Sequence, residues 1–271
     1  EKRKRIEEAN KMLIPVPKAT QQSLNLISFD PSGTFRFSEN RWVKVFGVKE
    51  ENENMNKETL SNLVSKLKSR IRITMQISGD IMKAGKTNCF VTLMLDGETY
   101  DEVRSKFNED EKVLSGQISL YPLTVDEVFG LITKQSKEGD FSYASFVRGK
   151  KDWKKQLPEM KEESGYLKLL SSYGESCFCL SYPKDVCGDV TEKLRELGCP
   201  VIVSVDVVGI SQEDNLDFNR SLEKKYNHRF GKSEEHKYMN VSYQLLFLSD
   251  SLDAKNIIER TIFSIYSKEG Y

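Results

Sequence analysis

The chain has 271 residues and a net charge of zero, because 41 lysines and arginines are matched by 41 aspartates and glutamates. This balance argues against a dedicated nucleic-acid-coating protein and against a surface steered strongly to membranes, although local basic patches are compatible with it. The length allows one large core or two moderate ones.

The cysteines indicate a reducing compartment. Their number is odd and they lie in apolar segments, which fits the cytoplasm better than a disulfide framework; they are Cys89, Cys177, Cys179, Cys187 and Cys199. No run approaches the length of a membrane span, and the start lacks the apolar stretch of a signal peptide. Because the chain has no initiator Met and ends within a helical pattern, we expect an excised fragment of a longer cytoplasmic protein.

A charged N-terminal segment, residues 1–20, precedes the first group of expected elements. Asp-Pro-Ser-Gly at residues 30–33 predicts a turn, and strands are expected over residues 24–29, 34–37 and 41–48. Apolar residues at helical spacing predict helices around residues 60–67 and over 97–114, with Gly116 as the stop of the second one. A third helix begins at Thr124, where Glu127 completes a capping box.

Residues 79–87 nearly spell a phosphate-binding loop. A P-loop requires glycine, four residues and then Gly-Lys-Ser/Thr, but here five residues separate Gly79 from Gly85 and Asp80 stands where a glycine is needed. The β-branched and apolar residues after Lys86 and Thr87 indicate a strand instead of the helix that should follow. We therefore expect a hairpin, with strands over 70–77 and 89–95, that binds no nucleotide.

Residues 141–164 are the expected linker, because they are polar, rich in lysine and without a sustained period. Beyond them, strands are expected near residues 166–173, 177–182, 200–210 and 238–248, with a helix around 190–197 and a last amphipathic helix over 254–265. The order β-β-α-β thus recurs. The sequence predicts an α+β fold of two similar halves, residues 21–140 and 165–271, with mainly antiparallel sheets and helices packed on one face.

No motif for metal binding or catalysis is recognised, so no metal, cofactor or catalytic residue is assigned. Cys177 and Cys179 alternate along a strand and point to one face, while His228 and His236 lie in a charged stretch without a nearby nucleophile. Asp206 interrupts a valine-rich strand and could be a functional carboxylate, but a position at the strand end, in water, is favoured.

Two basic stretches have alternative interpretations. Residues 148–155 interleave lysines and an arginine with Trp153, as in single-stranded nucleic-acid contacts, but nearby glutamates favour a solvated linker. Residues 2–5 could touch an anionic membrane, although a solvated tail is favoured because no apolar helix face accompanies them.

Residues 26–36 and 40–46 resemble the N-terminal domain of the large cytoplasmic ATPases of conjugative type IV secretion, in their Gram-positive form. The matching pattern is a strand, an Asp/Gly turn and two further strands. Residues 165–170, Tyr182-Pro183 and the strand at 201–210 resemble a second region of that family. The resemblance covers nearly the whole chain.

The resemblance implies a bacterial, non-catalytic domain that takes part in DNA transfer, with the ATPase motor C-terminal to this chain. Its implied partners are membrane proteins of the secretion channel, other ATPase subunits, or both, at the inner face of the membrane. The interaction residues expected on the strands at 34–48 are Arg36, Arg41, Trp42 and Lys44, with Trp42 as the aromatic anchor or, alternatively, a core residue. A nucleic-acid-binding module of a mobile genetic element is the second hypothesis and a stand-alone enzyme the third.

Overall fold

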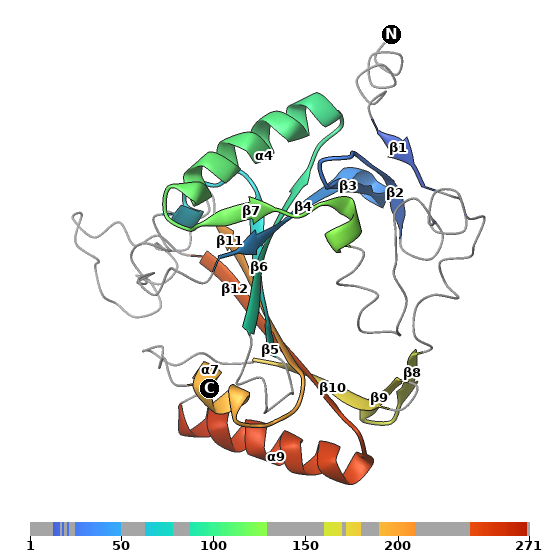
Figure 1. Cartoon of the computed structure of the whole chain (residues 1–271), viewed down its shortest axis with the longest axis vertical. Coiled ribbons are helices and arrows are strands. Elements are labelled where there is room, and N and C mark those ends of the chain that lie inside the picture. Colours follow the sequence, from blue (N-terminus) through green and yellow to red (C-terminus); the bar gives the residue numbers. More distant parts are fainter. Residues whose placement is uncertain are drawn as a thin grey trace, which may run out of the picture.

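The structure is a computed structural model, and it describes residues 13–16, 18, 21, 25–49, 63–77, 87–128, 160–169, 172–179, 190–209 and 239–269. Its centre is a 12-stranded sheet in which every strand pair is antiparallel. Helices flank the sheet at its two ends, with α4 at the top of Figure 1 and α9 at the bottom. The chain is therefore α+β, as predicted.

The sheet is built from both parts of the sequence. Its order is β1-β2-β3-β4-β6-β5-β11-β12-β10-β9-β8, with β7 paired to β4. The strands of the first part are β1 (Ile14–Pro15), β2 (Leu26–Phe29), β3 (Thr34–Phe37), β4 (Arg41–Val48), β5 (Arg70–Ile77), β6 (Thr87–Asp96) and β7 (Leu120–Pro122). Those of the second part are β8 (Met160–Glu163), β9 (Tyr166–Leu169), β10 (Ser172–Phe178), β11 (Val201–Gly209) and β12 (Met239–Ser249). Because β5 pairs with β11 in the middle, the sheet is continuous.

The two long helices begin at residues whose side chains accept a hydrogen bond from the backbone of the first turn. α4 (Tyr100–Ser115) has Thr99 as its N-cap and Gly116 as its C-cap, the predicted stop. α9 (Leu252–Lys268) is capped by Ser251, α7 (Val190–Arg195) is short, and η1 (Ser38–Asn40) is a 3₁₀ turn between β3 and β4. Thr124 and Glu127 form the predicted capping box, in which the Thr124 hydroxyl accepts from the Glu127 N–H and the Glu127 carboxylate accepts from the Thr124 N–H.

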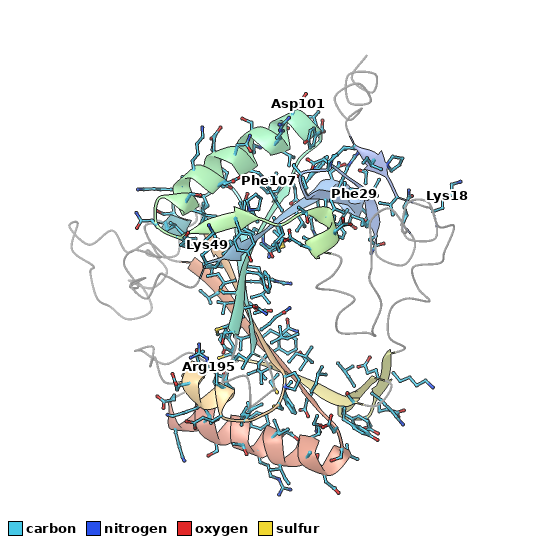
Figure 2. The ribbon with its side chains drawn as sticks, in the orientation of Figure 1. Lys18, Phe29, Lys49, Asp101, Phe107 and Arg195 are labelled. Carbon is cyan, nitrogen blue, oxygen red and sulfur yellow. The ribbon has the colours of Figure 1, made fainter. Side chains whose placement is uncertain are left out.

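Two cores lie on one face of the sheet. Alternate residues of a strand share a face, and on β11 Val207 packs in the α4 core with Phe107, while Val201 and Val203 pack in the α9 core with Ile262. Phe107 lies between α4 and the sheet (Figure 2). Hence α4 and α9 cover the same face, as expected.

A third core occupies the opposite face, which corrects the expectation that all helices lie on one side. Trp42 packs under α4, so the next residue of β4, Val43, points the other way. There Val43 packs with Val125 and Val128 of the helical turn at residues 125–128. Phe29 belongs to this core and is labelled in Figure 2.

The expected hairpin is confirmed for its strands. β5 pairs with β6 from Arg70 opposite Met94 to Ile77 opposite Thr87. A strand therefore follows Lys86, where a phosphate-binding loop would need a helix. The connecting residues 78–86 lie outside the described part of the chain.

Two other expectations change. The last residues of the expected linker, Met160–Glu163, form β8 and pair with β9, while residues 129–159 are outside the described ranges. Asp206 lies in the middle of β11 and not at a strand end in water. There it is opposite Arg72 of β5 and forms an ion pair with it. The pairing partner supplies the compensation that a partly buried carboxylate needs.

Candidate functional site

Of the four residues expected to mediate interactions, Trp42 lies in the core. Its side chain is 0% exposed, and its indole N–H donates to the Gly97 carbonyl over 2.8 Å. The Tyr100 ring lies 6.1 Å away, centroid to centroid. This is the core alternative that the sequence left open, and a buried ring offers no surface to a partner.

Arg36 and Lys44 also point toward the α4 side of the sheet. The half-buried Arg36 guanidinium stacks 5.3 Å from the Trp42 ring and donates to Asn40, and burial lowers its pKa. Lys44 is buried and its ammonium binds Glu111 of α4 over 3.0 Å. Only Arg41 has an exposed side chain.

Asp30, in the turn that carries the resemblance, organises the local structure. Its carboxylate is buried and accepts from the Ser32 hydroxyl at 2.7 Å and the Thr34 N–H at 3.0 Å. The Tyr100 hydroxyl donates to the other carboxylate oxygen. Burial, followed by this bond to Asp30, raises the pKa of Tyr100 to about 12. The turn is thus tied to the first residue of α4.

A hollow of about 560 Å³ lies where β5 begins and β6 ends, beside α4. We call it the strand-end hollow, and its lining residues are Lys68, Arg70, Met94, Leu95, Asp96 and Lys106. Arg41 begins β4 directly opposite Asp96, so the exposed member of the expected interaction residues lies next to this hollow. Its lining combines apolar side chains with three cations and one carboxylate.

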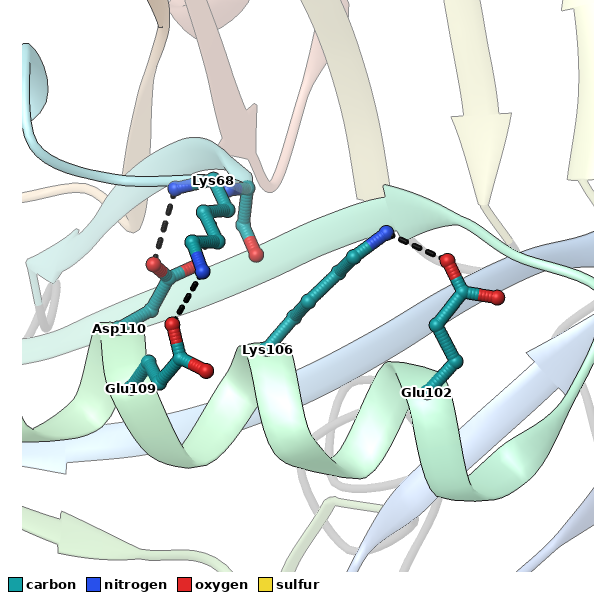
Figure 3. A network of polar contacts seen from close by, with 6 residues as sticks. Lys68, Glu102, Lys106, Glu109 and Asp110 are labelled. Atoms are coloured by element: carbon teal, nitrogen blue, oxygen red, sulfur yellow. Dashed lines mark hydrogen bonds and ion pairs between the residues drawn. The ribbon is translucent and has the colours of Figure 1, made fainter.

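The rim of the hollow is fixed by a buried carboxylate. Asp110 of α4 is 1% exposed, and its two oxygens accept from the backbone N–H groups of Lys68 and Ser69, each over 2.9 Å. The side chain of Lys68 binds Glu109, and that of Lys106 binds Glu102 over 2.6 Å (Figure 3). The bond between Lys68 and Glu109 raises the pKa of the amine and lowers that of the carboxyl.

This hollow was not predicted from the sequence, although the sequence carries one signal for it. Basic residues alternate at Lys66, Lys68, Arg70 and Arg72 as the chain enters β5, and alternate residues of a strand share a face. What no local pattern reveals is that α4 and the end of β6 supply Lys106 and Asp96 to the same place.

In the second part of the chain, a buried lysine joins α9 to the sheet through ion pairs. Lys255 of α9 is buried and binds Glu175 of β10 and Glu259 of its own helix. Burial raises the pKa values of Cys177 and Cys199 to about 11 each. Both thiols are therefore protonated at neutral pH and poor nucleophiles.

The described ranges contain no cluster of metal-ligating residues, and within them no helix has both the length and the apolar character of a membrane span. The predicted basic stretch at 148–155 and the histidines at 228 and 236 lie outside these ranges, as does Cys187.

The comparisons with known proteins assign no family. No family model matches the chain, and no curated protein is similar to it. Among solved structures, the crystal structure of aclacinomycin oxidoreductase is similar, with a TM-score of 0.35 and 9% identity. That similarity covers 85% of this chain, which spans only 41% of the other. It is too distant to carry an argument about fold or function.

Proposed function

We propose that the chain is a non-catalytic assembly domain of a conjugative type IV secretion ATPase. The observation that carries the proposal is the segment from Asp30 to Lys44, whose sequence resembles that family and which forms the β3–β4 hairpin anchored to α4 through Asp30 and Tyr100. The domain acts by surface recognition, contacts channel proteins or neighbouring ATPase subunits at the inner face of the membrane, and needs no cofactor of its own.

The two-half architecture belongs to this proposal and is supported by the strand registers. In the first half, Leu93 lies between Lys44 and Ile71; in the second, Phe247 lies between Glu175 and Val201. Each triplet joins the equivalent strands β4-β6-β5 or β10-β12-β11. On this correspondence Ile71 matches Val201 and Ile77 matches Val207.

The segment before each of these strands supports the same correspondence. The Leu67 N–H donates to the Val64 carbonyl in one half, and the Leu197 N–H donates to the Leu194 carbonyl in the other. Val64 and Leu194 are both buried under their half's helix. Thr74 pairs directly with Ser204, its own counterpart, so an approximate two-fold axis between the halves would pass through this pair.

Arg41 and the strand-end hollow beside it are the proposed docking surface. Exposed charges next to apolar side chains are typical of interfaces that form and dissociate. The experiment introduces Arg41→Glu into the full-length protein in donor cells and measures co-purification with channel proteins and the frequency of conjugative transfer. Both should fall, whereas Arg260→Glu on α9, also exposed, should change neither.

Two further outcomes would end the proposal. One is ATP hydrolysis by the purified chain without added subunits. The other is a natural gene in which no motor sequence with a P-loop follows Tyr271.

A further inference from the structure

We propose that the strand-end hollow binds a short acidic segment of a partner protein, with an apolar side chain of that segment seated between its cations. The inference rests on the proposed docking function and deepens it, because it names the chemistry of the partner and the place where it binds.

The lining of the hollow matches such a segment in two ways. Met94, which is half-buried, and the small exposed part of Leu95, 7% of that residue, provide apolar contact, which favours burial of an apolar side chain. Lys68, Arg70 and Lys106 surround them with positive charge, which favours carboxylates. A purely apolar or a purely charged ligand would satisfy only one of these features.

The cations are available to a ligand. Arg70 is exposed and has no ion-pair partner in the described part of the chain. Lys68 and Glu109 are about half exposed, at 51% and 50%, and ion pairs between exposed groups contribute little to stability. A carboxylate from a partner can therefore bind Arg70, and it can join the pair of Lys68 and Glu109 or replace Glu109 at small cost.

The site is also preorganised. Asp110 holds the backbone at Lys68 and Ser69, so the rim does not have to become ordered when a ligand binds, and the entropic cost of binding falls. An extended phosphate backbone carries a negative charge on every unit and would place several of them against the carboxylates of Asp96, Glu102 and Glu109, whereas a peptide that alternates acidic and apolar residues carries a charge only on every second residue. A short peptide can present its charges between them.

The test is fluorescence anisotropy with a short labelled peptide in which glutamate alternates with leucine. Three matched probes accompany it, in which glutamate is replaced by lysine, leucine is replaced by serine, or the peptide is replaced by a single-stranded oligonucleotide of equal charge. Only the glutamate–leucine peptide should bind tightly, and its binding should weaken as salt is raised.

Two variants of opposite sign locate the site. Arg70→Gln should raise the Kd of the glutamate–leucine peptide by about tenfold, as expected when a charge-assisted hydrogen bond is lost. Asp96→Asn, which removes the carboxylate charge from the lining of the hollow, should lower the Kd. Arg260→Gln, an exposed arginine on α9, should leave it unchanged, and equal melting temperatures would show that all variants are folded.

The inference is overturned if the glutamate–leucine peptide shows no saturable binding, if Arg70→Gln and Asp96→Asn shift its Kd in the same direction or not at all, or if the oligonucleotide binds more tightly. Failure of the probe while Arg41→Glu still lowers conjugative transfer would refute the acidic segment and leave the docking function standing. If the probe binds as expected but the full-length protein co-purifies with no channel protein or ATPase subunit, the secretion role alone is refuted.

Discussion

Trp42 combines packing with a hydrogen bond, so its removal is costly. The indole is fully buried in the α4 core and donates to the Gly97 carbonyl. Sequence alone could place an aromatic residue on this strand, yet an alternating pattern does not say which face a helix will cover. That depends on the pairing of β4 with β6 and on α4, both distant in sequence.

We predict that Trp42→Ala lowers the free energy of unfolding by about 3–5 kcal/mol, the range for truncating a large buried aromatic side chain. Its neighbour provides the control, because Arg41 is exposed on the same strand and Arg41→Ala should change stability by no more than about 0.5 kcal/mol. Urea unfolding monitored by circular dichroism measures both. Similar values for the two variants would contradict the position of Trp42 in the core.

Tyr100 predicts a dependence of stability on alkaline pH. Its pKa is raised from 10.0 to about 12 in the folded chain, so the unfolded chain loses this proton first as the pH rises. The stability that the group contributes is fully present below pH 10 and is lost between about pH 10 and 12. Tyr100→Phe should be less stable than the wild type at pH 8, and the gap should narrow above pH 10. Unfolding midpoints measured across this interval would refute the assignment if the gap stayed constant.

At the scale of elements, the central β5–β11 pair joins the two parts of the chain. Arg72 and Asp206 face each other across it, with two hydrogen bonds of 2.6 and 2.7 Å. The bond to Asp206 raises the pKa of Arg72. Because the geometry is bidentate and Asp206 is only 22% exposed, the pair should contribute more than a typical surface ion pair.

A double-mutant cycle with Arg72→Gln and Asp206→Asn should give a coupling energy of about 1 kcal/mol in low salt. The matched comparison is Lys106→Gln with Glu102→Gln, an exposed pair within α4, for which about 0.3–0.5 kcal/mol is expected. Equal coupling energies for the two pairs, from chemical denaturation, would mean that the central pair is screened like a surface pair.

The elements differ in how well the sequence predicted them. β3, β4 and β5 were predicted to the residue, and a helix over residues 97–114 with its stop at Gly116 was predicted from the spacing of apolar residues. These predictions use local information, namely turn residues, capping residues and the spacing of apolar residues. The β5–β11 pairing, the helical turn on the opposite face and the strand-end hollow depend on contacts between distant residues, which one sequence does not encode in any local pattern.

At the scale of the whole molecule, the continuity of the sheet determines which strands open first and expose their backbone amides to water. The central strands β5 and β11 have partners on both sides and residues in the two large cores, whereas β1 and β8 end the sheet. Amide hydrogen exchange should therefore be slowest in β5, β6, β11 and β12 and fastest in β1 and β8. Two separate groups of slow amides that exchange independently, one in each half, would contradict a single cooperative sheet.

The two ends of this long open sheet bear on how the protein behaves in concentrated solution. An unpaired edge can recruit strands from other molecules and grow into fibrils. One edge is the two-residue β1, where Pro15 has no N–H to donate, and the other is β8, where Lys161, Glu162 and Glu163 are exposed. Proline and charge at these positions are the devices by which sheets avoid edge-to-edge growth, so the chain can carry a 12-stranded open sheet and still resist polymerisation.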